Sequence, residues 1–510
     1  MEAFETFIEN LSGLIWGGTW ADDQILPVGP LAVVLLGLGL FYMIRLGFRP
    51  LRRFIPAIVE VWAGRKSDNS KNAISPLEAL STALSGQVGT GNLAGVATAI
   101  TVGGPGAIFW MWITALFGMA LAFAESSLAV KYREIDSNGR INGGPMYYIK
   151  NGLGKNWGWL AIFFCIGAIM SATVTGGMVQ ANSITQTIVN DGQNLFDIAI
   201  HPGIIGLILA VLVFAVIIGG IKSIGSVAGK VVPFMAALYV VVALVVLIIN
   251  ADRIPAAFSM IITSAFGLQE AAGGLAGYAV LSAVRFGVAR GLFSNEAGQG
   301  SAPIAHAATQ IKNPVRQGEI AMIGVFIDTL VICTMTALVI LTTTGTWTTA
   351  ADFIQYAGET TPYIWQAEGL NASAITNEAY SSAIPFGGLF VTICLSLFAF
   401  TTIVGWSYYA EQALTYMVGE WATMPFRFIW VGIIFLGALA KVEFVWLFGD
   451  LANASMAFPN LIAIAALSGV VLAMNKKNGD PDTENGDSRM LAGEGVEAAP
   501  DGTPLNAPAD

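Results

Sequence analysis

The sequence predicts an all-α membrane protein that crosses the bilayer about eleven times. Hydrophobic residues make up 55% of the 510 positions and charged residues only 11%, whereas a soluble domain carries about 25% charged residues. Apolar stretches of about 20 residues, the length that spans a bilayer, recur along the chain. Basic residues gather in alternate loops between these stretches, as the positive-inside rule requires.

The apolar stretches divide into one separate helix and two sets of five spans. The separate helix is expected at 25–44, the first set at 78–250 and the second at 276–474, within a transmembrane domain over 25–477. The eleven expected spans are 25–44, 78–100, 106–130, 158–186, 203–220, 226–250, 276–306, 317–343, 384–412, 425–440 and 443–474.

The distribution of Lys and Arg predicts the orientation of the chain. Seven basic residues lie between Arg45 and Lys71, which places that loop in the cytoplasm and the N-terminus outside. Alternation of the spans then places Lys476 and Lys477 inside. The segment 342–382 contains neither Lys nor Arg, and it is expected outside. The C-terminus is therefore expected in the cytoplasm.

Two terminal segments differ in composition from the spans. Residues 1–24 contain an amphipathic stretch, and we expect them to form an extracytoplasmic segment on the surface of the molecule. Residues 478–510 are rich in Gly, Pro, Asp and Glu. Such a composition cannot bury enough apolar area to fold, so a disordered acidic cytoplasmic tail is expected.

Glycines interrupt the first span of each set. The first interruption reads SGQVGTGN, from Ser85 to Asn92, and the second reads GLFSNEAGQGS, from Gly291 to Ser301. Opened backbone within a bilayer is tolerated only where it is buried in protein or lines a cavity. Interruptions at matching points of two halves are typical of the midplane site of a secondary transporter. Because each half has an odd number of spans, the halves are inverted, as in the leucine-transporter type.

An opened helix offers two kinds of backbone ligand. Carbonyl oxygens suit a hard cation such as Na⁺, and amides at a helix N-terminus suit a carboxylate. The clustered glycines have an alternative explanation, namely that they allow two membrane helices to cross at close distance. A dinucleotide-binding loop is excluded, because the order of Gly86, Gly89 and Gly91 does not follow the G-x-G-x-x-G pattern and no soluble βαβ unit surrounds it.

Two carboxylates at membrane depth are further candidates. Glu296 lies in the second interruption and Asp328 within the next span, and intramembrane ionisable groups are functional candidates by default. Glu296 has a structural alternative, since it could cap freed amides or pair with Arg285 or Arg290. The role of Asp328, coupling or structural, is left open by the sequence.

Two other spans carry polar residues that could face the interruptions. Gln180 lies on a polar stripe at helical spacing, and Thr402 and Trp406 are four residues apart on one helix face. Each has a simpler explanation, because hydroxyls bond back within membrane helices and Trp commonly packs or lies at the interface.

Several function classes are not expected. The sequence has two His and three Cys, without the spacing of a zinc or iron–sulfur site. No paired nucleophile and base are visible, so an enzyme is not expected. No basic face suits nucleic acid.

Three stretches resemble the sodium:alanine symporter family. GGPGAIFWMWITALFG, from Gly103 to Gly118, resembles the family signature over its whole length. SGQVGTGNLAGVATA, from Ser85 to Ala99, resembles the family's first broken helix, and SNEAGQGSAPIAHAA, from Ser294 to Ala308, its second. The similarity extends from about residue 25 to about residue 475.

The resemblance implies an alanine or glycine symporter of the leucine-transporter fold, with Na⁺ as coupling ion and no organic cofactor. The implied substrate-binding residues are Thr90, Gly91 and Asn92 for the carboxylate, Gln180, Thr402 and Trp406 around the pocket, and Ser294 and Asn295 opposite them. The implied Na⁺ ligands are carbonyls near Ala83 and Gly86 and the hydroxyl of Thr401 or Thr402. Which threonine serves the ion is left open.

The expected mechanism is alternating access, in which Na⁺ and a small neutral amino acid bind from outside and are released inside. One alternative is a proton-coupled carrier that uses Glu296 or Asp328. Another is a sensor that binds an amino acid without moving it, although the tail at 478–510 is too polar to supply a folded signalling domain. The resemblance implies a bacterial inner membrane as the location.

Overall fold

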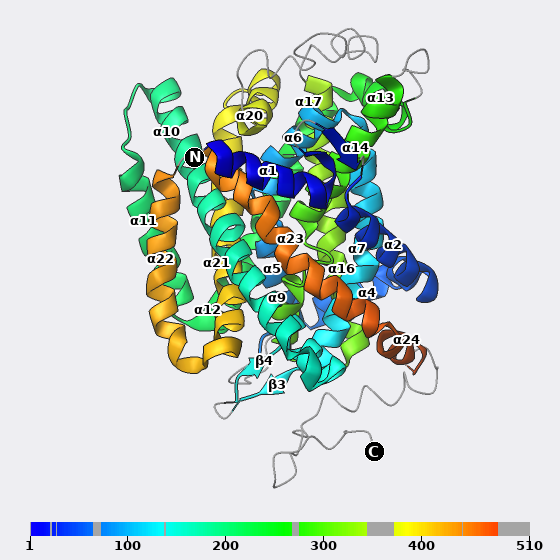
Figure 1. The fold of residues 1–510 in the computed structure, drawn as a ribbon. Helices are drawn as coiled ribbons and strands as arrows, with labels where there is room; N and C mark the ends of the chain where they lie inside the picture. The colour runs from blue at the N-terminus through cyan, green and yellow to red at the C-terminus, as the bar shows by residue number, and fades with distance from the viewer. Residues whose placement is uncertain are drawn as a thin grey trace.

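The computed structural model describes residues 2–20, 23–26, 28–64, 73–136, 139–267, 275–343, 372–440 and 442–477. Each of the eleven predicted spans coincides with one helix or with a chain of consecutive helices (Figure 1). The predicted tail, 478–510, and most of the predicted outer loop lie outside the described residues.

The separate helix is α2 (Pro30–Arg45). The first set of spans comprises α5 (Pro76–Gln87), η1 (Thr90–Asn92), α6 (Ala94–Gly103), α7 (Gly106–Lys131), α9 (Gly158–Ser171), the π-helix η4 (Ala172–Met178), α10 (Val179–Phe196), α11 (Pro202–Ile217) and α12 (Gly220–Ile249). The second set comprises α14 (Leu275–Asn295), α15 (Ala302–Ala307), α16 (Pro314–Val325), the π-helix η6 (Phe326–Cys333), α17 (Thr334–Thr343), α21 (Gly387–Val418), α22 (Thr423–Leu439), α23 (Val442–Ala466) and α24 (Ser468–Lys477).

Shorter elements connect the spans, and several of them were not predicted. They are α1 (Glu2–Trp16), β1 (Gly18–Trp20), β2 (Asp23–Leu26), α3 (Arg49–Arg52), α4 (Phe54–Ala63), β3 (Glu134–Ile135), β4 (Ile141–Asn142), α8 (Pro145–Tyr148), η2 (Ile149–Leu153), η3 (Lys155–Trp157), η5 (Ala251–Arg253), α13 (Ile254–Ala265), α20 (Ala372–Ala383) and η7 (Glu420–Ala422). The strands form two antiparallel hairpins, β1–β2 and β3–β4.

Length and hydropathy explain why some spans are continuous and others are not. In the described part of the chain, six continuous helical segments are long and apolar enough to cross a membrane, and α23 with α24, bent by 56°, would make a seventh. The first span of each set is not among these segments. Glycine-rich backbone divides it into α5 (12 residues) and α6 (10 residues) in the first set, and into α14 (21 residues) and α15 (6 residues) in the second. The chain is an integral membrane protein whose first span in each repeat is broken.

Figure 1 places the connecting elements at two opposite ends of the bundle. The hairpin β3–β4 and α24 lie at one end, and α13 and α20 lie at the other. This separation agrees with the predicted alternation of loops, which assigned the first group to the cytoplasm and the second to the outside. Which end faces the cytoplasm stays a prediction.

Small residues allow α7 to lie close to the second broken helix. A Cβ placed on Gly118 of α7 would be 3.0 Å from the Cβ of Ala297, and one on Gly291 of α14 would be 3.2 Å from the Cβ of Thr114. Close approach of this kind is how membrane helices gain van der Waals contact. The signature stretch that ends at Gly118 therefore forms the packing surface behind the second break.

Candidate functional site

The first span opens where its sequence changes from helix-forming residues to glycines. Ser75 caps α5, since its Oγ accepts from Glu78 N (3.2 Å) and Glu78 Oε2 accepts from Ser75 N (2.8 Å). The helix ends at Gln87, after which Val88 is extended (φ −82°, ψ 97°). One 3₁₀ turn, η1, leads into α6. The structure therefore contains the predicted break, and the helix restarts at Ala94.

The second span opens at Glu296, directly after α14. Glu296 has φ +56°, a conformation that L-residues rarely adopt, and Gly298 and Gly300 have φ of +87° and +86°. Backbone of this kind persists only where surrounding contacts hold it. Glu125 of α7 supplies one such contact, because its Oε2 accepts from the amide of Gly298 (3.2 Å). The Nδ2 of Asn460 donates to the same carboxylate and also to the carbonyl of Gly298 (2.9 Å).

The two breaks lie against each other in the interior. The carboxamide of Gln87 donates to the carbonyl of Asn295 (2.9 Å), and that of Asn92 donates to the hydroxyl of Ser294 (3.2 Å). A Cβ on Gly91 would lie 3.1 Å from the ring of Phe293. Segments some 200 residues apart in sequence therefore share one site, as the inverted-repeat prediction requires.

Asp328 joins this contact from the π-helix η6. Its carboxylate accepts from Asn92 Nδ2 (2.6 Å), from Ser294 Oγ (2.8 Å) and from Thr329 Oγ1 (2.7 Å). Asn295 donates in turn to Thr329 Oγ1 (3.2 Å). Asp328 is fully buried, and the hydrogen bonds to it come from neutral groups. A nearby cation or a bound proton would stabilise a carboxylate that is buried in this way.

Oxygen atoms of α21 gather beside the end of α5. The hydroxyl of Thr402 lies 3.2 Å from the carbonyl oxygen of Val88 and 3.0 Å from that of Phe398. The hydroxyl of Thr401 lies 2.9 Å from the same Phe398 oxygen. A Cβ on Gly89 would be 2.6 Å from Thr402 Oγ1, so only glycine permits this approach. Neutral oxygens clustered in this way match the ligand preference of a hard monovalent cation.

Trp406, one turn further along α21, is held by the second break. Its indole Nε1 donates to Glu296 Oε1 (2.9 Å), and Ser301 Oγ donates to Glu296 Oε2 (2.5 Å). The ring also packs directly on Gly176 of η4, leaving no space there for a side chain. Glu296 therefore holds the tryptophan, and of the two arginines suggested as its partners, Arg290 pairs with Asp450 instead (2.9 Å).

Gln180 reaches the first break from α10. Its Oε1 accepts from the amide of Thr90 (3.2 Å), and its Nε2 donates to the carbonyl of Thr175 (3.1 Å). The amide of Gly89 is bound by Asn92 Oδ1 (2.8 Å). The carboxamide of Gln180 therefore occupies the amide of Thr90, one of the residues predicted to bind a carboxylate.

Three buried acceptors at the breaks have no hydrogen-bond partner in the described structure: Gln87 Oε1, Thr90 Oγ1 and Gln299 Oε1. Buried polar groups are nearly always satisfied, so unpaired ones need an explanation. All three come from the two opened segments. A ligand that brings several donors, such as an ammonium group, would satisfy them.

Contacts close the site on both sides. On the α14 side, Arg290 pairs with Asp450, whose carbonyl accepts from the indole of Trp16 in α1 (3.2 Å). On the α15 side, Ile74 and Thr309 form a parallel β-bridge. Ile74 lies just before α5 and Thr309 just after α15, so the bridge ties the two broken helices together. Arg133 donates to the carbonyls of Ala307, Thr309 and Ile311 at 2.8, 2.8 and 3.1 Å.

The structure thus brings together most of the predicted site residues. Thr90, Gly91, Asn92, Gln180, Ser294, Asn295, Glu296, Asp328, Thr401, Thr402 and Trp406 all lie in or against the breaks. Ala83 lies a turn inside α5, away from its opened end. Gln87, Val88 and Gln299 were not predicted as ligands, although all three lie within the glycine-rich stretches. Among the described residues, no cluster of three or more His, Cys, Asp or Glu could hold a metal ion.

Comparisons with known proteins agree with this architecture. Residues 2–489 match the sodium:alanine symporter family. The chain is 41% identical to the sodium/alanine symporter AgcS of Methanococcus maripaludis, over 93% of this chain and 97% of that protein. It is 37% identical to the amino-acid carrier protein AlsT of Bacillus subtilis, over 87% and 88% of the two chains. Among solved structures, MhsT in complex with L-phenylalanine is similar in fold (TM-score 0.56, 14% identity, 80% of this chain and 93% of MhsT). The predicted leucine-transporter fold is confirmed.

Proposed function

Since the chain belongs to the sodium:alanine symporter family and is a cation-coupled amino-acid symporter, we propose that it imports alanine or glycine together with Na⁺ by alternating access. One observation carries this proposal. The two opened helices face each other in the interior and leave unpaired acceptors beside a cluster of neutral oxygens. Such a site accepts a zwitterion and a monovalent cation without a permanently paired charge.

The proposed Na⁺ site uses the carbonyl oxygen of Val88 and the hydroxyls of Thr401 and Thr402. The carbonyl of Gly86, in the last turn of α5, stays a candidate ligand. The carbonyl of Ala83 belongs to the regular part of the helix, where the amide four residues later uses it. Val88 therefore takes its place in the proposal.

The substrate is proposed to lie between the two breaks. Its carboxylate would bind at Thr90, Gly91 and Asn92 in the 3₁₀ turn, with Gln180 moving from the amide of Thr90 to the ligand and the amide of Asn92 leaving the carbonyl of Gly89 (3.3 Å). Its ammonium would satisfy the unpaired oxygens of the two opened segments. Ser294 and Asn295 would bound the site opposite, where they already contact Asn92 and Thr329.

Two aromatic rings would limit the size of the substrate side chain. Phe293 packs on Gly91, and Trp406 is fixed between Glu296 and Gly176. A large side chain would have to displace Phe293 or the ring of Trp406, which is bonded through its N–H to Glu296 and packed on Gly176, whereas a hydrogen or a methyl group would not. Alanine and glycine are accordingly the proposed substrates.

The proposed location is the plasma membrane, as a bacterial inner-membrane protein with the N-terminus outside and the C-terminus in the cytoplasm. One Na⁺ moving inward across about 100 mV supplies about 2.3 kcal/mol, and a tenfold Na⁺ gradient adds about 1.4 kcal/mol. Because alanine carries no net charge, one Na⁺ per substrate would make transport electrogenic.

Proton coupling is the second candidate, because Asp328 is buried and bound only by neutral donors. A carboxylate in that position could exchange a proton during the cycle. In this version Asp328, or Glu296 beside it, titrates while the substrate moves, and Na⁺ is not required.

The test is uptake of isotope-labelled alanine into proteoliposomes that contain the purified protein. We expect uptake driven by an inward Na⁺ gradient, abolished when choline replaces Na⁺, and competed by unlabelled glycine but not by leucine. Uptake driven by a pH gradient without Na⁺ would establish the proton-coupled alternative. Binding of alanine with no accumulation under either gradient would indicate a sensor.

A further inference from the structure

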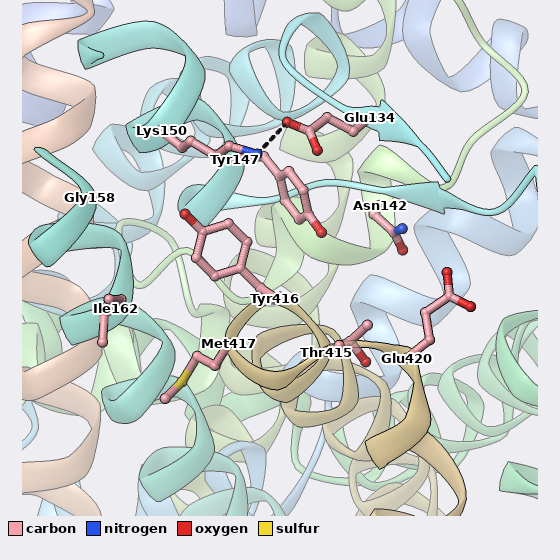
Figure 2. A pocket seen from close by; sticks show the side chains of 11 residues that line it. Glu134, Asn142, Tyr147, Lys150, Gly158, Ile162, Thr415, Tyr416, Met417 and Glu420 are labelled. Carbon is pink, nitrogen blue, oxygen red and sulfur yellow. Dashed lines mark hydrogen bonds and ion pairs between the residues drawn. The ribbon is translucent and has the colours of Figure 1, made fainter. Parts of the chain in front are cut away.

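A hollow lined by charged, aromatic and apolar side chains lies at the end of the bundle that carries β3 and β4, apart from the two breaks (Figure 2). Its volume is about 510 Å³. Its lining includes Glu134, Tyr147, Lys150, Ile162, Tyr416 and Glu420. They come from the hairpin, from α8 and η2, from the start of α9, from the end of α21 and from η7.

Exposed tryptophans fix the depth of this hollow relative to the bilayer. Trp157 and Trp159 stack at 6.2 Å at the start of α9 and are 37% and 60% exposed. Trp421, in η7 after α21, is 73% exposed. Tryptophan gathers at the membrane–water interface, where its ring meets acyl chains and its N–H meets water. The hollow therefore lies at the level of the lipid headgroups.

One rim of the hollow continues into a surface that faces acyl chains. Ile162 lines the hollow, and Phe163 and Ile166 follow it along α9. All three side chains are more than 40% exposed. A molecule bound in the hollow can thus extend an apolar chain along α9 without entering water.

The polar side of the hollow carries charges of both signs. Lys150 Nζ lies 3.0 Å from Glu134 Oε1, as Figure 2 shows, and Arg140 lies 4.0 Å from Glu420 Oε2. All four side chains are at least 36% exposed. Exposed pairs of this kind contribute little to stability. A ligand with one positive and one negative group can therefore replace these ion pairs with little loss of free energy.

The floor of the hollow is aromatic. Tyr147 and Tyr416 meet edge to face, with ring centroids 5.3 Å apart, and both rings turn toward the centre of the view in Figure 2. Burial, helped by the nearby carboxylate of Glu134, raises the pKa of Tyr147 above its ordinary value. Its phenol is therefore a neutral O–H donor, which suits an anionic oxygen, while the ring faces attract a cation.

From these observations we propose that the hollow binds the headgroup of a phospholipid that carries both an ammonium and a phosphate, namely phosphatidylethanolamine. The phosphate meets Lys150 and the phenol of Tyr147, and the ammonium meets the carboxylates of Glu134 and Glu420. The acyl chain follows α9 from Ile162. A choline headgroup has no N–H for the carboxylates, and a glycerol headgroup has no positive charge for them. This inference does not depend on which substrate is transported.

The test compares lipids retained by the full-length protein in nanodiscs of equal parts phosphatidylethanolamine, phosphatidylcholine and phosphatidylglycerol. Native mass spectrometry then counts the lipids that stay bound after release. We expect phosphatidylethanolamine to be enriched over both other lipids. The double variant Glu134→Gln/Lys150→Gln keeps the net charge and should lower this enrichment about tenfold, as expected for loss of one charge-assisted hydrogen bond from the ammonium to Glu134, since the phosphate contact is common to all three lipids.

A matched control is the double variant Glu60→Gln/Arg316→Gln. This pair, at 3.6 Å and with side chains 28% and 33% exposed, lies outside the hollow and should leave the enrichment unchanged. If the first variant is not monodisperse, Glu420→Gln provides the same comparison with a smaller change. Equal retention of the three lipids by the natural protein, preference for phosphatidylglycerol, or unchanged enrichment in the hollow variants would each overturn the proposal.

Discussion

The hydroxyl of Thr402 lies 3.2 Å from the carbonyl oxygen of Val88, the first residue beyond the end of α5. This contact joins a continuous helix, α21, to the place where the first span leaves the helical pattern. The affinity for an ion bound between the two atoms would therefore depend on the position of the broken helix relative to α21. Coupling of ion binding to helix movement follows from that arrangement.

Thr402→Val keeps the shape of the side chain and removes the oxygen. A hydrogen bond or ligand contact to a charged group is worth about 1.5–3 kcal/mol, so we expect the Na⁺ concentration for half-maximal uptake to rise at least about tenfold. Uptake measured over a range of Na⁺ concentrations checks this. Ser407→Ala is the control, because that hydroxyl on the same helix bonds only to Val404 O (2.6 Å).

Gly89→Ala should abolish uptake. The added Cβ would lie 2.6 Å from Thr402 Oγ1, far inside van der Waals contact, so α5 and α21 would be forced apart at the proposed ion site. Gly95→Ala, in α6 of the same span, adds the same methyl where no atom lies within 4 Å. It should insert and transport normally. Normal Na⁺-dependent uptake by the Gly89 variant would remove the ion site from this position.

Glu296 is expected to set substrate size through Trp406. In Glu296→Ala the buried indole N–H loses its acceptor, which costs about 1–3 kcal/mol and frees the ring to turn. Competition by leucine or methionine should then increase, whereas Glu296→Gln keeps an oxygen for the indole and should retain alanine selectivity. Uptake competition assays measure both. Unchanged selectivity in the alanine variant would mean that packing on Gly176 alone holds the ring.

Sequence reasoning predicted the spans and the breaks because both follow from local properties. Hydropathy marks a span, and clustered glycines beside Gln87, Asn92 and Asn295 mark an opened one. The partner of Glu296 could not be predicted in the same way. Its bond to Trp406 joins spans that are 110 residues apart, and a nearby Arg290 offered an equally plausible ion pair. That arginine instead pairs with Asp450, and nothing local in the sequence indicates this.

The choice between carbonyls was also beyond the sequence. Ala83, Gly86 and Val88 all lie near the glycine cluster, and only the observed end of α5 at Gln87 separates a carbonyl inside the helix from one beyond it. Helix ends are hard to place to within one or two residues from sequence. The π-helices η4 and η6, which place Gly176 against Trp406 and Asp328 beside Asn92, carry no sequence signal that we recognised.

Arg290→Ala should open the site toward the face that carries α13 and α20. Cys333 provides a native reporter, because its Sγ lies 3.2 Å from Ser294 Oγ and 3.4 Å from Asn92 Nδ2 and is buried. In a background without Cys165 and Cys394, a membrane-impermeant maleimide added on that face should label Cys333 faster in the variant. Asp450→Asn, which keeps a hydrogen-bond acceptor for Arg290, should give a smaller increase. Equal labelling rates in all three proteins would exclude this ion pair as a closing contact.

Arg133→Ala should open the site toward the opposite face, which carries β3 and β4. Arg133 binds three carbonyls at the end of the second broken helix, and the Ile74–Thr309 bridge beside it ties that helix to the first. Removing the guanidinium leaves those carbonyls without their charged donor, so maleimide added on this face should label Cys333 faster while labelling from the other face stays slow.

Arg133→Lys adds a pH dependence to the same experiment. Burial lowers the pKa of Arg133 to about 10, so the guanidinium stays charged at neutral pH. A lysine has a lower intrinsic pKa than arginine, and the same burial lowers it further. The lysine variant should therefore be closed at pH 6, where its ammonium is charged, and should label progressively faster as the pH rises and the proton is lost. The natural protein should show no such change between pH 6 and pH 8 beyond the intrinsic reactivity of Cys333, which the alanine variant measures. A lysine variant that stays closed at high pH would mean that the bridge at Ile74, rather than the charge at Arg133, closes this face.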